Sequence, residues 1–184
     1  GNDKIYGGAG LDTLNGDDGA DSIWGGFDHD IISGGAGNDL LYGEDGNDKI
    51  AGNLGSDTMS GGLGNDTLIG GLGLDKFYGG TGNDTFILDT SDASMDRIYE
   101  FQATGLDADK LDISALLIDY DATDAIANFL RLTVSLTDTN IRINTDGIGT
   151  DFITVARIYG ANLTGTAQSY IDNGILITEK PTEA

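Results

Sequence analysis

The sequence predicts an all-β protein in two parts, a thin repetitive solenoid over residues 1–87 and a small β-rich region over residues 88–184. Two observations predict the solenoid: an aspartate at every ninth residue, and an apolar residue two positions after each aspartate. A third observation predicts the second part, because the period stops after Ile87 and the apolar runs then lengthen. A fixed short period indicates a repeat architecture, in which each unit buries its apolar side chain by stacking on its neighbours.

Each nine-residue unit divides into turn positions and strand positions. Counted from Gly7, position 1 is glycine in every complete repeat, and position 4 is glycine except at Asp28. Glycine at these positions suits a tight turn with positive φ or a close approach of the backbone to an ion. Aspartate tolerates the left-handed conformation better than most residues, so the turn with Asp28 stays an open case. Positions 7 to 9 are predicted to form a three-residue strand whose middle side chain points inward.

The inward side chains at position 8 run from Ile5 to Phe86. The large Phe77 and Phe86 occupy this position in the last two repeats, where the thin solenoid must join a thicker core. The segment Gly1–Tyr6 has the sequence of the last two-thirds of another repeat, so we expect a longer parent protein with more repeats upstream.

Position 6 carries the chemistry of the repeat, because it is always aspartate. These residues are Asp3, Asp12, Asp21, Asp30, Asp39, Asp48, Asp57, Asp66, Asp75 and Asp84. Carboxylates stacked at a strand spacing of about 5 Å repel one another strongly unless a cation neutralises them. Hydrogen bonding among Asn- and Asp-rich turns is the alternative, and it leaves that repulsion unexplained. All-oxygen ligation is what a hard cation such as Ca²⁺ requires.

The pattern G-G-x-G-x-D-x-U-x in these residues resembles the calcium-binding repeat of the RTX (repeats-in-toxin) family, over about half of the chain. The resemblance implies a parallel β-roll, or RTX solenoid, in which two repeats make one coil and repeat n stacks on repeat n+2. It implies several Ca²⁺ ions, about seven, between the stacked turns. It also implies that backbone carbonyls at positions 1 and 3 of one repeat, and at positions 2 and 4 of the repeat above, complete each oxygen shell.

The implied carbonyl ligands at positions 1 and 3 are Gly7, Ala9, Gly16, Asp18, Gly25, Phe27, Gly34, Ala36, Gly43, Asp45, Gly52, Leu54, Gly61 and Leu63. Those at positions 2 and 4 are Gly26, Asp28, Gly35, Gly37, Glu44, Gly46, Asn53, Gly55, Gly62, Gly64, Gly71, Gly73, Gly80 and Gly82.

Composition narrows the classes of partner. The chain has 31 acidic and 9 basic residues and a net charge of −22, which argues against nucleic acid and anionic lipid and favours divalent cations. No stretch approaches the roughly 20 apolar residues of a membrane span, so no membrane insertion is expected. The absence of cysteine agrees with an extracellular protein that metal stabilises in place of disulfides.

The repeats are also poor in buried surface. Glycine loses the most conformational entropy on folding, and one buried side chain in nine residues does not offset that loss. We therefore expect the roll to be disordered without Ca²⁺ and to fold when Ca²⁺ binds, because a ligand that binds only the folded state stabilises it.

The second part is predicted to contain six strands, near residues 97–101, 111–114, 130–136, 139–144, 152–159 and 175–178. Asp138 and Thr139 are expected to turn a hairpin. One or two short helices are expected at 122–129 and 167–172. We expect this region to form a β-rich C-terminal cap that protects the last strands of the roll from edge pairing.

Five segments in the second part carry a further resemblance: DRIYEF (96–101), GLDADKLDISALL (105–117), FLRLTVSLTDTNIRINTDG (129–147), TVARIYGANL (154–163) and IDNGILITE (171–179). They are similar to the C-terminal target region of large RTX surface proteins and adhesins. The resemblance implies an uncleaved export signal that an ABC-type type I secretion machinery reads, and a protein that is secreted or displayed on the bacterial cell surface.

No catalytic residue is expected in this chain, which we do not interpret as an enzyme. His29 is the only histidine and lies in a repeat turn, so neither a zinc-protease H-E-x-x-H motif nor a Ser-His-Asp arrangement is supported. We interpret His29 as a solvated turn residue. The acidic segment 144–151 is interpreted as a plain turn rather than a loop cation site.

Position 9 of alternate repeats forms one row that is aromatic except at Ser60. Its aromatic residues are Tyr6, Trp24, Tyr42 and Tyr78. Stacking that stiffens the sheet, or contact with a neighbouring segment, is the favoured interpretation. The alternative is an exposed platform for a surface glycan or a protein ligand.

Taken together, these patterns favour a calcium-triggered folding and type I secretion module at the C-terminal end of a large RTX protein, most readily an adhesin. One alternative is a carbohydrate- or ligand-binding β-roll, although ice binding lacks the required threonine row and the net charge disfavours an alginate-type polysaccharide. Another is the non-catalytic C-terminal part of a secreted protease or lipase.

Overall fold

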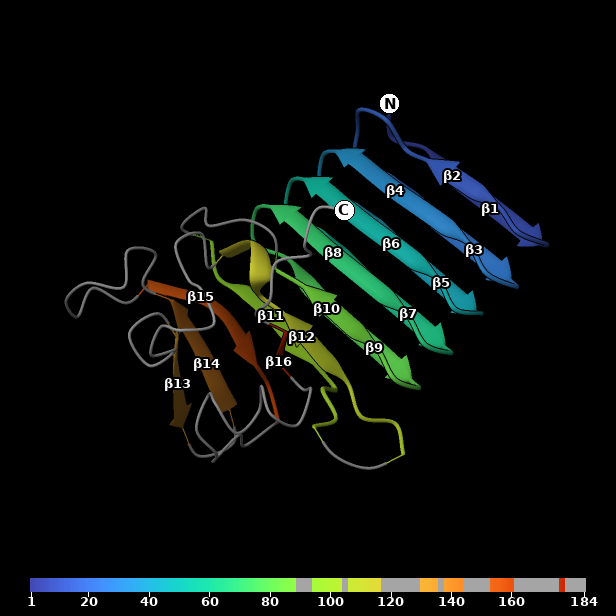
Figure 1. Cartoon of the computed structure of the whole chain (residues 1–184). Coiled ribbons are helices and arrows are strands. Elements are labelled where there is room, and N and C mark those ends of the chain that lie inside the picture. Colours follow the sequence, from blue (N-terminus) through green and yellow to red (C-terminus); the bar gives the residue numbers. More distant parts are fainter. Residues whose placement is uncertain are drawn as a thin grey trace, which may run out of the picture.

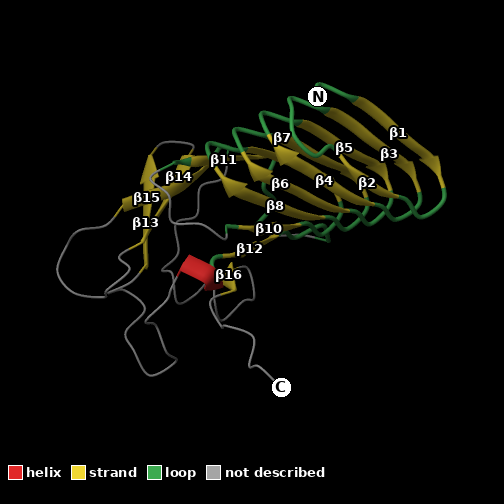
Figure 2. Ribbon diagram, turned by 90° about the horizontal axis from the view of Figure 1, so that it is seen from above, coloured by secondary structure: helices red, strands yellow, loops and turns green. Residues whose placement is uncertain are grey.

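The computed structural model describes residues 1–88, 94–103, 106–116, 130–135, 138–143, 153–160 and 176–177. These residues form two β-sheets, which over the repeats are the two walls of a flat parallel roll (Figures 1 and 2). The nine strands of the first sheet, called sheet A, are β1 (Lys4–Ala9), β3 (Ser22–Phe27), β5 (Leu40–Asp45), β7 (Thr58–Leu63), β9 (Lys76–Thr81), β11 (Asp96–Tyr99), β15 (Ile153–Ile158), β14 (Asp138–Ile143) and β13 (Leu130–Ser135). The seven strands of sheet B are β16 (Leu176–Ile177), β12 (Lys110–Asp112), β10 (Thr85–Ile87), β8 (Thr67–Leu72), β6 (Lys49–Leu54), β4 (Ile31–Ala36) and β2 (Thr13–Asn15).

The register within each sheet confirms that repeat n stacks on repeat n+2. Ile5 pairs with Ile23, Ile23 with Leu41, and on the opposite sheet Ile32 pairs with Ile50, always in parallel. Consecutive repeats therefore alternate between the two walls, and equivalent residues two repeats apart lie side by side.

The strands are longer than the sequence predicts. β1 and β3 to β9 each span six residues, from position 7 to position 3 of the next repeat, instead of positions 7 to 9 alone. Pairing continues through the glycines, as between Gly8 and Gly26, while position 1 drops out of the register. Gly8 has a φ of 104°, so the strand bends there without losing its parallel partner. The predicted three-residue strands were too short because the conformational preference of glycine favours turns at positions 1 and 2.

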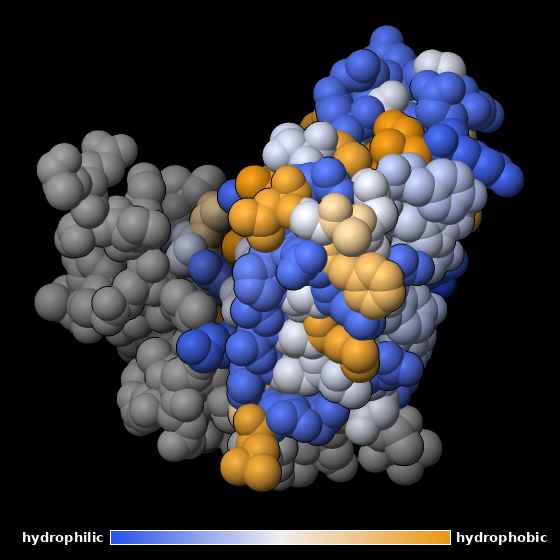
Figure 3. Space-filling view, turned by 90° about the vertical axis from the view of Figure 1, so that its right-hand side faces the viewer, coloured by the Kyte–Doolittle hydropathy of each residue, from blue (hydrophilic) through white to orange (hydrophobic). Residues whose placement is uncertain are grey.

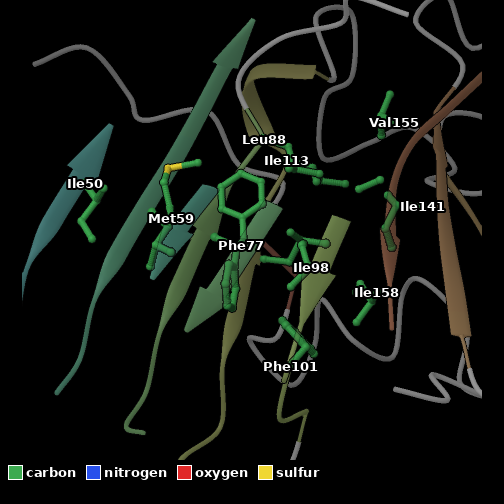
Figure 4. Close-up of a cluster of buried hydrophobic side chains, with 14 of the residues drawn as sticks. Ile50, Met59, Phe77, Leu88, Ile98, Phe101, Ile113, Ile141, Val155 and Ile158 are labelled. Carbon is green, nitrogen blue, oxygen red and sulfur yellow. The ribbon is translucent and has the colours of Figure 1, made fainter. Parts of the chain in front are cut away.

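One inward side chain per repeat builds the core of the roll, as predicted for position 8. From Ile23 to Phe86 these side chains are at most 1% exposed. Phe77 and Phe86 meet edge to face at 6.0 Å between ring centroids, and Phe86 also contacts Phe101. The close-up in Figure 4 shows the aliphatic row reaching Phe77 and then widening toward Ile98, Ile141 and Ile158.

The two sheets continue past Ile87, where the nine-residue period ends. β11 pairs with β9 through Ile98 and Phe77, and β12 pairs with β10 through Leu111 and Phe86, both in parallel. The last strands of the regular repeats therefore have no free edge, as expected of the C-terminal region.

Beyond β11, sheet A ends in an antiparallel meander of β15, β14 and β13. The expected hairpin forms, but Asp138 and Thr139 lie within β14 and do not turn it. Ser135 pairs with Asp138, and residues 136–137 between them lie outside the described part of the chain. The helices expected at 122–129 and 167–172 also lie outside the described residues, and the described helix is a single 3₁₀ turn, Ser114–Leu116.

Some large apolar side chains stay on the surface, several of them at the ends of strands. Phe27, Leu54, Leu63 and Leu72, all at position 3, are 45–61% exposed. Figure 3 shows such apolar patches separated by hydrophilic residues. Within the described residues, no helix has the length and hydropathy that crossing a bilayer requires.

The division between inward leucines and exposed leucines at strand ends can be tested with a matched pair. Replacing the fully buried Leu68 with alanine leaves a cavity and should lower the free energy of unfolding by about 2–5 kcal/mol. Leu72→Ala, at a residue that is 45% exposed, should change it by less than about 0.5 kcal/mol. Denaturant titration with millimolar Ca²⁺ measures both, and equal effects would contradict the assigned core.

Candidate metal centres

The position-6 aspartates form a continuous inner ladder. From Asp21 to Asp84, the Oδ1 atom of each accepts a hydrogen bond from the backbone N–H of the aspartate two repeats earlier, as between Asp39 N and Asp57 Oδ1 at 2.8 Å. The same bond recurs along both sheets at 2.6–2.9 Å. From Asp21 to Asp84 these residues are at most 2% exposed.

The second carboxylate oxygen of these residues is buried without a hydrogen-bond partner in the described part of the chain. This holds for the Oδ2 atoms of Asp12, Asp21, Asp30, Asp39, Asp48, Asp57, Asp66 and Asp84. A buried ionised oxygen is costly unless it is paired or binds a metal, so each of these atoms requires a positive charge.

Glycine at position 1 makes room for this oxygen. A Cβ atom on Gly34 would collide with Asp39 Oδ2 of the same repeat and approach the carbonyl of Gly52, two repeats further on. Gly43, beside Asp48 Oδ2 and the carbonyl of Gly61, has the same surroundings. From Asp12 to Asp66, the structure therefore brings the aspartate Oδ2 close to a position-1 carbonyl oxygen.

The other predicted carbonyls have two kinds of surroundings. Those of positions 2 and 4 face the turn two repeats further on, where a Cβ on Gly26 or Gly37 would collide with the carbonyl of Gly8 or Gly19. Those of position 3 accept a backbone hydrogen bond, as from Gly46 N to Leu63 O at 2.8 Å. A carbonyl oxygen has two lone pairs, so this bond leaves it one for a cation.

The Asp28 turn keeps the geometry of its neighbours. Asp28 adopts a φ of 76°, which is positive like that of most position-4 glycines, although theirs is larger, as at Gly37 with 143°. Its carbonyl faces Gly46 just as the Gly19 carbonyl faces Gly37. The departure from glycine therefore does not displace this backbone oxygen.

Burial raises the pKa of Asp57 and of Asp66 to about 7, and neighbouring aspartates of the ladder add to the rise while a backbone hydrogen bond opposes it. Burial likewise raises the pKa values of Asp39, Asp48 and Asp84. A pKa raised mainly by desolvation shows that the fold disfavours the charged form of these groups unless a cation joins them.

The donor set fits a hard divalent cation. Within the described residues, no three acidic or histidine side chains converge as a metal cluster, so side chains alone make no site. Carboxylate Oδ2 atoms and turn carbonyls together offer the all-oxygen shell that Ca²⁺ prefers, and a bound ion would neutralise the buried carboxylates. Asp3 differs from the rest, because its side chain is 59% exposed and pairs with the N-terminal amine at 3.8 Å.

Two ladder members, Asp96 and Asp109, were missed at the sequence level. Asp75 N donates to Asp96 Oδ1, and Asp84 N donates to Asp109 Oδ1, both at 3.0 Å. The signal was an apolar residue two positions after each aspartate, Ile98 and Leu111, at spacings other than nine.

Asp109 differs from the repeat aspartates because both of its oxygens are occupied. Its Oδ2 accepts a hydrogen bond from Gln102 N at 2.7 Å, so a backbone N–H takes the place that a cation would have. Burial raises the pKa of Asp109 to about 6, against these bonds. On sheet B the ladder thus ends with a carboxylate that the chain itself satisfies.

An outer ladder at position 5 was also missed. The Oδ1 atoms of Asn38, Asn47 and Asn65 accept backbone N–H bonds from two repeats further on, at 2.7–2.8 Å. His29 is exposed, as expected of a turn residue, and its Nδ1 accepts the same bond from Asn47 N at 2.7 Å. Position 5 therefore favours short side chains whose hydrogen-bond acceptor reaches a backbone N–H of a neighbouring turn.

The predicted aromatic row stacks face to face. The Tyr6 and Trp24 ring centroids are 4.6 Å apart with planes 8° apart, and Trp24 and Tyr42 lie at 5.6 Å and 10°. Both faces of Trp24 are therefore covered, which agrees with the favoured stacking interpretation. The row continues beyond the repeats, because Tyr78 stacks on Tyr99 and Tyr99 on Tyr159.

Charge removal at one ladder position tests the metal assignment. Asp57→Asn keeps the Oδ1 acceptor but removes the anionic ligand. It should abolish the stabilisation that one filled site adds, about 2.7 kcal/mol at 100 times its dissociation constant. Calcium titration calorimetry and denaturation in Ca²⁺ measure this. Asp45→Asn, at an exposed position-3 side chain, is the control, and equal behaviour of the two variants would refute the assignment.

The raised pKa values predict acid-induced order in calcium-depleted protein. Asp57 and Asp66 titrate near 3.8 in the unfolded chain and near 7 in the roll. The stability that protonation contributes is fully present below pH 3.8 and is lost as the pH rises to about 7. Far-ultraviolet circular dichroism of the dialysed protein should thus show more β-structure at pH 4 than at pH 7.5, and the reverse order would contradict the linkage.

Comparison with known proteins assigns the repeats to a family. A family profile described as the RTX calcium-binding nonapeptide repeat (4 copies) matches residues 1–32, 24–59 and 51–86. No curated protein matches the chain.

Two solved structures of Azotobacter vinelandii mannuronan C5-epimerase subunits are similar to the chain. The AlgE6R2 subunit aligns over 83% of this chain and 95% of its own, with a TM-score of 0.55 and 26% identity. The AlgE6R3 subunit aligns over 96% of this chain and 85% of its own, with a TM-score of 0.36 and 22% identity. Together with the stacking register and the buried carboxylates, the profile match and the AlgE6R2 alignment show that residues 1–86 are RTX calcium-binding repeats folded as a parallel β-roll.

Proposed function

We propose that the chain is a calcium-triggered folding and type I secretion module from the C-terminal end of a large secreted or surface RTX protein, an adhesin. The observation that carries this proposal is the row of buried Oδ2 atoms without partners. They make the folded roll dependent on cations, whereas a purely structural solenoid would satisfy them with its own donors, as Asp109 does.

Calcium concentration then decides where the chain folds. Extracellular modules bind Ca²⁺ with dissociation constants of about 10⁻⁴–10⁻³ M. About seven sites of this strength stay empty in a bacterial cytosol and fill outside the cell. The unfolded chain is the form that an ABC-type exporter can thread, and folding outside hinders its return.

The C-terminal region supplies the second half of this proposal. Its strands β11 and β12 pair with the last strands of the repeats and extend both sheets, and its sequence segments resemble the target region of exported RTX proteins. A parent enzyme with its catalytic part elsewhere is the alternative, because the structural neighbour AlgE6R2 belongs to an epimerase.

Two measurements on the full chain test the proposal. Circular dichroism should show a disordered chain in EDTA and a β spectrum in millimolar Ca²⁺. A reporter fused to residues 1–184 should leave cells that carry a type I exporter, and a fusion to residues 1–87 should stay inside. A β spectrum that EDTA leaves unchanged would contradict calcium-triggered folding. Export of the 1–87 fusion would show that the second part does not carry the export signal.

A second candidate function is the binding of an acidic polysaccharide on the outer face of sheet A. Lys76, Arg97 and Arg157 are in register on three neighbouring strands. Among the described residues, no carboxylate lies within 4.0 Å of their charged nitrogens. The net charge of −22 disfavours an anionic ligand over the surface as a whole, yet this face gathers three of the nine basic residues. The neighbour AlgE6R2 comes from an enzyme named for mannuronan, which is an acidic polysaccharide.

A further inference from the structure

The row of stacked rings on sheet A has one interruption. Tyr6, Trp24 and Tyr42 form one stack of three on β1, β3 and β5. A second stack of three, Tyr78, Tyr99 and Tyr159, belongs to β9, β11 and the end of β15. Between them, on β7, stands Ser60, which is in register with Tyr42 on one side and Tyr78 on the other.

The interruption has the width of one ring. Strands lie about 4.8 Å apart, so the rings of Tyr42 and Tyr78 are about 9.6 Å apart across Ser60. Within each stack, neighbouring centroids are 4.6–5.6 Å apart. A six-membered ring above Ser60 would therefore lie at stacking distance from both tyrosines, each of which offers a face that no described aromatic ring covers.

The surroundings of Ser60 are polar on one side and basic on the other. Thr58, two residues before Ser60, lies on the same outward face and is in register with Lys76. Lys76 is in turn in register with Arg97, whose buried Nε has no hydrogen-bond partner in the described part of the chain.

The third cation is held in place. Arg157 donates from Nε to Asn140 Oδ1 at 2.9 Å, and its guanidinium carbon lies 5.8 Å from the Tyr159 ring centroid. The row of cations is thus ordered at its far end and begins beside the interruption.

The tyrosine beside the interruption keeps its proton. Burial, Tyr99 and the Glu100 carboxylate raise the pKa of Tyr78 above its ordinary value of 10.0. Its hydroxyl therefore remains a hydrogen-bond donor at any physiological pH.

We propose that the Ser60 interruption is a subsite for one pyranose ring of an acidic polysaccharide, held between Tyr42 and Tyr78. The ring faces stack on the tyrosines, sugar hydroxyls bond Ser60 and Thr58, and the sugar carboxylate lies toward Lys76. This subsite rests on the second candidate function and not on secretion. An aromatic side chain of a partner protein would fill the same width but leave the hydroxyls and Lys76 without a role.

Filling the interruption is the direct test. Ser60→Tyr completes the row of rings and blocks the subsite, while Ala51→Tyr places the same side chain at the equivalent position 9 of β6 on sheet B. The probes are a tetrasaccharide of galacturonate and the neutral maltotetraose, titrated into calcium-loaded full-length chain. Proton NMR of the sugar reports the site, because protons held between two ring faces move upfield.

Wild type and Ala51→Tyr should shift the galacturonate signals alike. Ser60→Tyr should weaken binding at least about tenfold, and Tyr42→Ala and Lys76→Gln should weaken it as well. Every variant should keep the β spectrum in Ca²⁺, which separates loss of the subsite from loss of the fold.

The remaining outcomes overturn the proposal in distinguishable ways. Equal binding by Ser60→Tyr and Ala51→Tyr removes the subsite but leaves polysaccharide binding on this face intact. Equal affinity for maltotetraose, or no effect of Lys76→Gln, removes the assignment to an acidic sugar. Absence of any shift with wild type removes both the subsite and the second candidate function, and binding of a tyrosine-containing peptide in its place identifies a protein partner.

Discussion

The carboxylate oxygens that point into the turns without a donor are the constraint on which the structure depends. Each position-6 aspartate has two oxygens with separate roles: Oδ1 belongs to the hydrogen-bond ladder, and Oδ2 faces the position-1 glycine. Because Oδ1 is held by backbone, Oδ2 cannot turn toward water. The roll can therefore close only if a proton or a cation joins each of these oxygens, and calcium is the ligand that the carbonyl-rich turns suit.

This arrangement couples neighbouring sites. The N–H of one aspartate bonds the carboxylate of the next on the same wall, so an ordered site positions the following one. We therefore expect binding and folding to be coupled along the roll, because in a solenoid each repeat contacts its neighbours. Asp109 ends the sheet B ladder with the Gln102 N–H, which satisfies the last carboxylate without an ion.

The sequence predicts the parts of this fold that a strict period determines. Position 8 as the core follows from residue identity at fixed spacing. The n to n+2 register, and with it the row at position 9, comes from the resemblance to RTX repeats. Asp96 and Asp109 escaped prediction because the spacing of nine ends at Asp84, so their place in the ladder comes from tertiary pairing. The extent of the strands was also mispredicted, because the parallel partners extend pairing through glycines that isolated segments would place in turns.

The inner and outer surfaces of the roll are under different constraints. Inside, glycine at position 1 and aspartate at position 6 are required by contacts that leave no room for alternatives, as the surroundings of Gly34 show. Outside, position 9 of sheet A is in register with its neighbours in the row, and serine at residue 60 costs the fold two ring contacts without disturbing the register. A stack of seven rings would be more stable than two stacks of three. The serine is therefore better explained by something that occupies its place than by the stability of the sheet.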